Sequence, residues 1–153
     1  MLGRQLGPEV ETAAAEQALR AAYPHAEIVL LGTPVRTALL RGRPAPIDTA
    51  FALPTATDVF AAASDAELDA DEQSAFFAPV TVAPIDLAVQ AHGGGHWSNP
   101  FLLRLGARFT IGTRSPDTVE LDRWLPSRYH QYEALRWLEV VERWARPARS
   151  PHD

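Results

Sequence analysis

Residues 28–53 have the sequence IVLLGTPVRTALLRGRPAPIDTAFAL, in which two apolar runs flank a segment that contains residues typical of the start and end of a helix. The first run is typical of a buried strand, and Gly32 ends it. Thr33 is a favourable N-cap residue, a proline follows at the first helical position, and Gly42 suits the left-handed position after a helix. This segment therefore predicts a strand, a short helix over residues 33–41, and a second strand.

The remaining sequence extends this alternation in both directions. The predicted helices cover 8–23, 33–41, 56–64 and 126–146, and the predicted strands cover 27–31, 47–53, 80–82, 85–89, 109–111 and 118–121. The last helix has apolar residues at spacings of three and four. This order predicts one α/β (α+β) domain over residues 1–153, in which helices flank a mixed sheet and the C-terminal helix is long.

The composition excludes several classes of chemistry. The 153 residues include no cysteine, which excludes disulfides, thiol nucleophiles and cysteine-ligated zinc. All 14 basic residues are arginine, a bias that we attribute to a GC-rich bacterial genome, so no lysine can form a Schiff base. The net charge of −5 argues against a protein that coats nucleic acid. Because no long apolar run or leader-like N-terminus occurs, we expect a cytoplasmic protein that has no membrane partner.

Three short motifs are incomplete. His25 and Glu27 match half of a zinc deaminase signature whose other half needs cysteines. The acidic segment at 65–76 lacks the glycine and the final glutamate of an EF-hand. His92 precedes three glycines, as in some esterase oxyanion loops, but no G-x-S-x-G elbow accompanies it. We therefore expect the glycine run to be a mobile loop.

One group of five residues suits the binding of phosphate and Mg²⁺. Gly32 and Thr33 lie between a strand and a helix N-terminus, where free N–H groups attract phosphate. Arg36 lies one turn into the helix, within reach of a phosphate oxygen. Asp48 and Asp86 belong to later strands, and carboxylates so placed suit Mg²⁺, which bridges nucleotide phosphates. The sequence thus predicts a nucleotide or Mg²⁺ site formed by these five residues.

Residues 28–112 resemble the polymerase-β-like nucleotidyltransferase superfamily, in particular the head domain of tRNA CCA-adding enzymes and bacterial poly(A) polymerases. The positions in register are Val35-Arg36, Leu39-Leu40, Gly42-Arg43, Ile47-Asp48 and Ala50. The resemblance implies that Asp48 and Asp86 are catalytic, metal-binding carboxylates. It also implies that Gly32, Thr33 and Arg36 bind the nucleotide, with RNA as a weak further partner.

The main departure from this family is Pro46, which stands where the family has its first aspartate. A two-metal mechanism that has lost one of three carboxylates is expected to lose most of its activity. We therefore expect a degenerate member, a pseudoenzyme that binds nucleotide or Mg²⁺ without catalysis.

An alternative function remains open: a non-catalytic, dimeric protein-interaction module that has no nucleotide site. All four tryptophans lie after residue 96, and aromatic residues are enriched at interfaces. The spacing of Trp137 and Trp144 favours core packing. Val140, however, lies off the main apolar row of the C-terminal helix. Val140 and Trp144 are therefore the candidate contacts of a homodimer.

Overall fold

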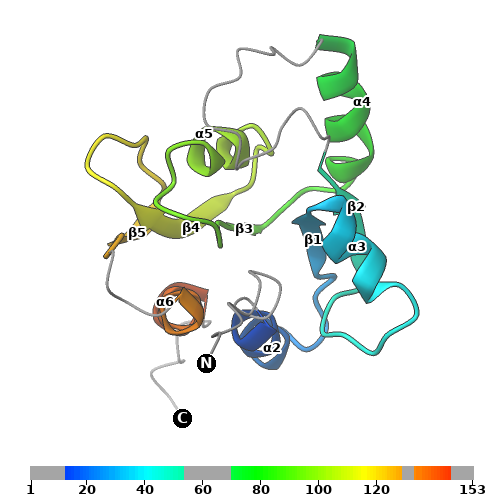
Figure 1. Cartoon of the computed structure of the whole chain (residues 1–153), viewed down its shortest axis with the longest axis horizontal. Coiled ribbons are helices and arrows are strands. Elements are labelled where there is room, and N and C mark those ends of the chain that lie inside the picture. The colour runs from blue at the N-terminus through cyan, green and yellow to red at the C-terminus, as the bar shows by residue number, and fades with distance from the viewer. Residues whose placement is uncertain (1–12, 54–69, 129–132, 146–153) are drawn as a thin grey trace, which may run out of the picture.

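The computed structural model describes residues 13–53, 70–128 and 133–145 (Figure 1). Within these ranges the elements are α2 (Ala13–Ala22), β1 (Val29–Gly32), α3 (Pro34–Leu40), β2 (Thr49–Ala52), α4 (Ala70–Val80), β3 (Leu87–Val89), α5 (Ser98–Leu103), β4 (Phe109–Arg114), β5 (Arg123–Pro126), α6 (Glu133–Val140) and the π-helical turn η2 (Val141–Ala145). The chain is therefore an α/β protein, as expected.

The strands form two small sheets, β1-β2 and β3-β4-β5. Every described pair is parallel, which corrects the expectation of a mixed sheet. Helix α3 joins β1 to β2 and helix α5 joins β3 to β4, because parallel neighbours need a crossover connection. β4 and β5 are joined by the short connection 115–122, which contains no helix.

Helices cover both faces of the β3-β4-β5 sheet (Figure 1). On one face α2, α6 and η2 form a buried cluster with β4, whose members are Ala15, Ile111, Trp137, Val140 and Val141. On the other face α5 contributes Leu102 to a second cluster, against which Phe77 of α4 packs. Leu87 and Val89 of β3 pack against the first cluster and Ala88 belongs to the second, as the alternation of side chains along a strand requires.

The helix predicted over 33–41 is confirmed as α3, together with the residues predicted to cap it and to end it. The Thr33 hydroxyl accepts a hydrogen bond from the Arg36 N–H at 3.2 Å and so caps α3. Gly42 has a φ of +71°, the left-handed conformation expected after a helix. The flanking strands β1 and β2 are confirmed within two residues of the expected bounds.

Two predicted strands are wrong. Val80 ends α4, and the Thr81 N–H and hydroxyl both bond back to the Phe77 carbonyl, so 80–82 closes a helix. The segment 118–121 contains no strand: the Thr118 hydroxyl and N–H both bond to the carbonyl of Ser115, which closes a turn that ends at Thr118. Such local bonds compete with a strand ladder. The strand instead comes at β5, two residues later.

The C-terminal helix expected over 126–146 is shorter in the described residues. Its first residue, Pro126, belongs to β5, where it pairs with Arg114 of β4. The helix proper begins at Glu133 and changes to π-helical geometry at Val141. The helix predicted over 56–64 lies outside the described residues.

Val140 is not available to a second copy of the chain. Its side chain has no exposed surface and belongs to the monomer core with Ala15 and Ile111. Trp137 lies in the same cluster, which confirms its assignment to the core. The side chain of Trp144 lies outside the described part of the chain. Homodimerisation therefore stays a prediction, and its Val140 contact is withdrawn.

We expect Val140→Glu to unfold the monomer rather than to separate a dimer, because a charge without a partner would enter the core. The matched control is Leu135→Glu on the same helix, where the native side chain is 59% exposed. Urea denaturation should show a loss of several kcal/mol for the first variant and within about 0.5 kcal/mol for the second. A folded Val140→Glu chain of unchanged midpoint would contradict the core assignment.

Candidate ligand site at the carboxyl edge of the strands

The structure does not bring Asp48 to Gly32 and Thr33. β1 and β2 are parallel, and Val29 pairs with Thr49 while Gly32 pairs with Ala52. Asp48 precedes β2 and so lies at the amino edge of the pair, whereas Gly32 and Thr33 lie at the carboxyl edge. At roughly 3.3 Å per residue, the four-residue strand separates the two edges by about 13 Å. The two halves of the predicted site are therefore at opposite ends of the strands.

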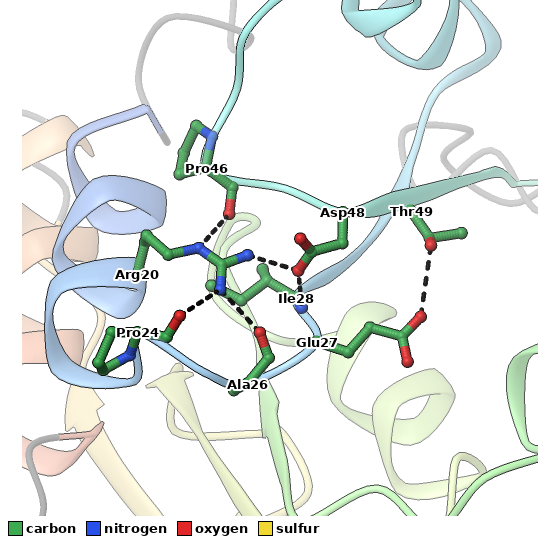
Figure 2. A network of polar contacts seen from close by, with 8 residues as sticks. All are labelled: Arg20, Pro24, Ala26, Glu27, Ile28, Pro46, Asp48 and Thr49. Carbon is green, nitrogen blue, oxygen red and sulfur yellow. Dashed lines mark hydrogen bonds and ion pairs between the residues drawn. The ribbon is translucent and has the colours of Figure 1, made fainter.

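Asp48 anchors the amino edge (Figure 2). Its carboxylate accepts a hydrogen bond from the Ile28 N–H at 2.7 Å and forms an ion pair with Arg20 of α2. The same guanidinium donates to the carbonyls of Pro46 at 3.2 Å and Ala26 at 2.7 Å. First the Ile28 N–H and then Arg20 lower the pKa of Asp48 below its usual value of 3.8. These contacts tie α2 to the starts of β1 and β2.

We expect Asp48→Asn to lower the melting temperature near neutral pH. Because the folded pKa of Asp48 is lowered, its contribution to stability is present above the unfolded pKa of 3.8 and is lost as pH falls through the folded pKa. Melting curves of wild type and variant, followed from about pH 7 to about pH 2, should therefore converge at the acid end.

Asp122 also has a lowered pKa, first because of the Thr110 hydroxyl and then because of the Thr110 N–H, and so it also contributes to the pH dependence of stability. Asp122 is present in both proteins, so its titration cancels in their difference. A difference in melting temperature between the two proteins that stays the same at every pH would contradict the anchoring role of Asp48.

Asp86 also lies at an amino edge, immediately before β3, and its carbonyl accepts a hydrogen bond from the Phe109 N–H at 3.0 Å. Across residues 13–53, 70–128 and 133–145, no three histidine or acidic side chains are grouped as a metal site would require. The expected Mg²⁺ site therefore stays a prediction.

Arg36 is engaged by Glu16 rather than directed to an open phosphate site. The two side chains, each 11% exposed, form an ion pair between α3 and α2. The side chain of Arg36 also lies against Gly32, because a Cβ added at Gly32 would be 3.3 Å from the Cδ of Arg36. Arg36 thus packs α3 onto α2 behind the turn at Gly32.

We expect Arg36→Met to cost roughly 3 kcal/mol of unfolding free energy, because it removes one charge of a buried ion pair and keeps the other. The double variant Glu16→Met/Arg36→Met removes both charges and should recover most of that loss. Urea denaturation of the three proteins tests this expectation. If Arg36→Met kept full stability and lost only phosphate affinity, Arg36 would regain its expected role as a ligand.

The glycine loop after β3 is held in place, contrary to the expectation of a mobile segment. Its four successive carbonyls, at residues 92–95, all accept hydrogen bonds from the protein. The His92 carbonyl accepts from the Ser98 hydroxyl at 3.1 Å, and the Gly93 carbonyl accepts from the Thr113 hydroxyl at 2.7 Å. The Gly94 carbonyl accepts from the Ser115 N–H at 2.8 Å, and the Gly95 carbonyl accepts from the Asn99 N–H at 3.0 Å. The loop therefore turns its carbonyls inward.

The buried side chain of Gln90 fixes this loop to β4. Its Oε1 accepts from the Thr113 N–H at 2.9 Å and from the Thr113 hydroxyl at 3.2 Å. Its Nε2 donates to the carbonyl of His92 and to the Ser98 hydroxyl, the latter at 2.8 Å. One amide thus joins the end of β3, the loop and the neighbouring strand. The sequence did not single out Gln90, although it is a polar residue that directly follows an apolar strand.

The glycines are required by this geometry. Gly93 and Gly95 have φ values of +53° and +90°, in the left-handed region that side chains disfavour. A Cβ at Gly94 would overlap the Ser115 hydroxyl, and one at Gly95 would overlap the side chain of Asn99. Asn99 is fully buried, and its Oδ1 has no hydrogen-bond partner.

The loop contains three N–H groups that have no hydrogen-bond partner among the described residues, and an exposed aromatic ring lies next to it. Within the described part of the chain, the N–H groups of Gly93, Gly94 and Gly95 donate no hydrogen bond to protein. Successive unbonded N–H groups in a turn are a feature of backbone anion sites. Here Gly93 and Gly94 are partly exposed, whereas Gly95 is buried. Trp97, which is 52% exposed, follows directly and meets His96 edge-to-face at 4.7 Å.

The loop follows β3, which is the first strand of the second sheet along the chain. Leu31 of β1 packs against the buried cluster that contains Ala88 of β3, although the two strands belong to separate sheets. Open α/β sheets bind ligands outside the carboxyl ends of their strands. Gly32 and Thr33 follow β1 and the glycine loop follows β3, so each lies at the carboxyl end of its own strand.

Comparisons with known proteins support the fold only. No family model matches this sequence, and no curated protein matches it. A crystal structure described as the glycosyl transferase family 9 from Veillonella parvula DSM 2008 has a similar structure, with a TM-score of 0.63 and 15% identity. The likeness covers 95% of this chain and 40% of that one, so this chain spans well under half of that protein. No helix in the described residues is long and apolar enough to cross a bilayer.

Proposed function

We propose that this chain is a glycosyltransferase-like domain that binds a phosphorylated or nucleotide-linked sugar at the carboxyl edge of its parallel strands. The observation that carries the proposal is the glycine loop, whose four carbonyls are all bonded, while the partly exposed N–H groups of Gly93 and Gly94 donate no hydrogen bond to any described residue. The expectation of nucleotide binding is thereby kept, but loop 92–97 replaces Asp48 and Asp86 as the site that carries it.

The chemistry of the loop suits both parts of such a ligand. Backbone N–H groups in a concave turn stabilise the negative charge of a phosphate without a lysine or a metal ion. The half-exposed ring of Trp97 offers a flat apolar surface to the C–H face of a sugar.

The fold likeness adds an analogy rather than a residue match. The similar solved structure is described as a glycosyl transferase, and this chain spans 40% of its length. Since function lies in a site rather than in a fold, this likeness only narrows the class of ligand to be tested. We propose that the domain binds without carrying out the transfer by itself, in keeping with the non-catalytic function expected from the sequence.

We expect nucleoside diphosphate sugars or sugar phosphates to shift the amide resonances of residues 93–97 in a ¹⁵N-labelled sample. Trp97→Ala should weaken that binding about tenfold, through loss of the stacking surface. The matched control is Phe109→Ala, since Phe109 is similarly exposed at 54% but lies at the amino edge of β4.

The result that would overturn the proposal is equal weakening in the two variants, which would indicate nonspecific contact with exposed aromatic rings. Absence of any shift with every ligand at millimolar concentration would also overturn it. That second outcome would favour the alternative expectation of a protein-interaction module.

A further inference from the structure

The hydroxyl groups of Ser115 and Ser127 lie next to the glycine loop. Ser115 directly follows β4 and Ser127 directly follows β5, and both strands run parallel to β3, so the two serines stand at the same carboxyl edge as the loop. A Cβ added at Gly94 would lie 2.1 Å from the Oγ of Ser115 and 3.5 Å from the Oγ of Ser127. Both hydroxyl oxygens therefore lie within 3.5 Å of one point beside the backbone of Gly94.

Backbone hydrogen bonds hold both serines in place. The Ser115 N–H donates to the Gly94 carbonyl and the Ser127 N–H donates to the Arg114 carbonyl, each at 2.8 Å. The Ser115 carbonyl in turn accepts from the Thr118 N–H at 3.1 Å. Because the backbone is fixed on both sides, rotation about χ1 is the main freedom that each hydroxyl keeps. A ligand that binds these groups therefore pays little conformational entropy.

The protein itself does not use these donors. Neither serine hydroxyl forms a hydrogen bond with a residue that the structure describes, although both side chains are half-buried. The N–H groups of Gly93 and Gly94 also donate to no described residue. Half-buried polar groups without a protein partner bond to water or to a ligand. The carboxyl edge of β3, β4 and β5 thus offers two hydroxyls and two N–H groups to a bound molecule.

We propose that Ser115 and Ser127 bind the phosphate group of the ligand together with the N–H groups of Gly93 and Gly94, an inference that rests on the proposed function of the loop. Backbone N–H groups can only donate, so a ligand group that occupies all four positions needs several acceptor oxygens on one centre. An ionised phosphate has these oxygens, and its charge strengthens each hydrogen bond. The serines thus select the phosphate, whereas Trp97 contacts the sugar.

The experiment measures the affinity for inorganic phosphate and for a sugar phosphate through the amide resonances of residues 93–97. We expect Ser115→Ala and Ser127→Ala each to weaken both affinities about tenfold, because each variant loses one hydrogen bond to a charged oxygen. Trp97→Ala should weaken only the affinity for the sugar phosphate, since inorganic phosphate has no sugar to stack on the ring.

Two further variants serve as controls. Ser74→Ala removes an exposed serine hydroxyl from α4 and should leave both affinities unchanged. Ser127→Thr keeps a hydroxyl at the end of β5 and should retain most of the affinity that Ser127→Ala loses. The melting temperature of each ligand-free alanine variant should match that of the wild type, because no hydrogen bond within the described protein is removed.

Three results would overturn the proposal. One is unchanged affinity in both alanine variants while Trp97→Ala weakens sugar phosphate binding, which would keep the proposed function and remove the serines from it. Another is a lower melting temperature of the ligand-free alanine variants, which would show that the hydroxyls bond within the protein. The third is absence of binding by the wild type, which would remove the proposed function and this inference together.

Discussion

The side-chain amide of Gln90 is the contact on which the carboxyl edge of this protein depends. It is 2% exposed, and both ends of the amide are bonded, Oε1 to Thr113 of β4 and Nε2 to the loop that follows β3. A buried amide costs free energy unless its hydrogen bonds are made, so the strand pair and the loop must adopt this arrangement together. Gly112 allows the close approach, since a Cβ there would lie 2.7 Å from the Gln90 Cβ. The position of the glycine loop is therefore a consequence of how β3 pairs with β4.

The local parts of the fold could be predicted from the sequence. The N-cap at Thr33, the glycine after α3 and the strand on each side are encoded within a few residues of each other. Elements that depend on distant partners were not predictable in this way. The segment 118–121 has strand-forming residues, but the Thr118 hydroxyl closes a turn onto Ser115 and the ladder begins at Arg123 instead. Parallel pairing itself depends on the whole topology.

The candidate site illustrates the same limit. An aspartate close in sequence to a glycine turn suggested one site, but the parallel β1-β2 pair puts Asp48 and Thr33 at opposite edges. A run of three glycines suggested mobility, because glycine lowers the conformational barriers of the backbone. Two of the four loop carbonyls bond to residues just beyond the loop, but the other two bond to Thr113 and Ser115, about twenty residues away in sequence. No local pattern around residues 92–96 contains that information.

The separation of contacts between the two edges has a consequence for how this domain can change over evolutionary time. The anchor formed by Asp48, Arg20 and the start of β1 lies at the amino edge. The exposed residues His96 and Trp97 lie on the outer side of the loop at the carboxyl edge, with no role in that anchor. Substitutions at these two positions can therefore alter what the surface recognises at little thermodynamic cost. The inward-facing groups of the same loop have no such freedom, so variation in recognition is confined to one side of a fixed backbone.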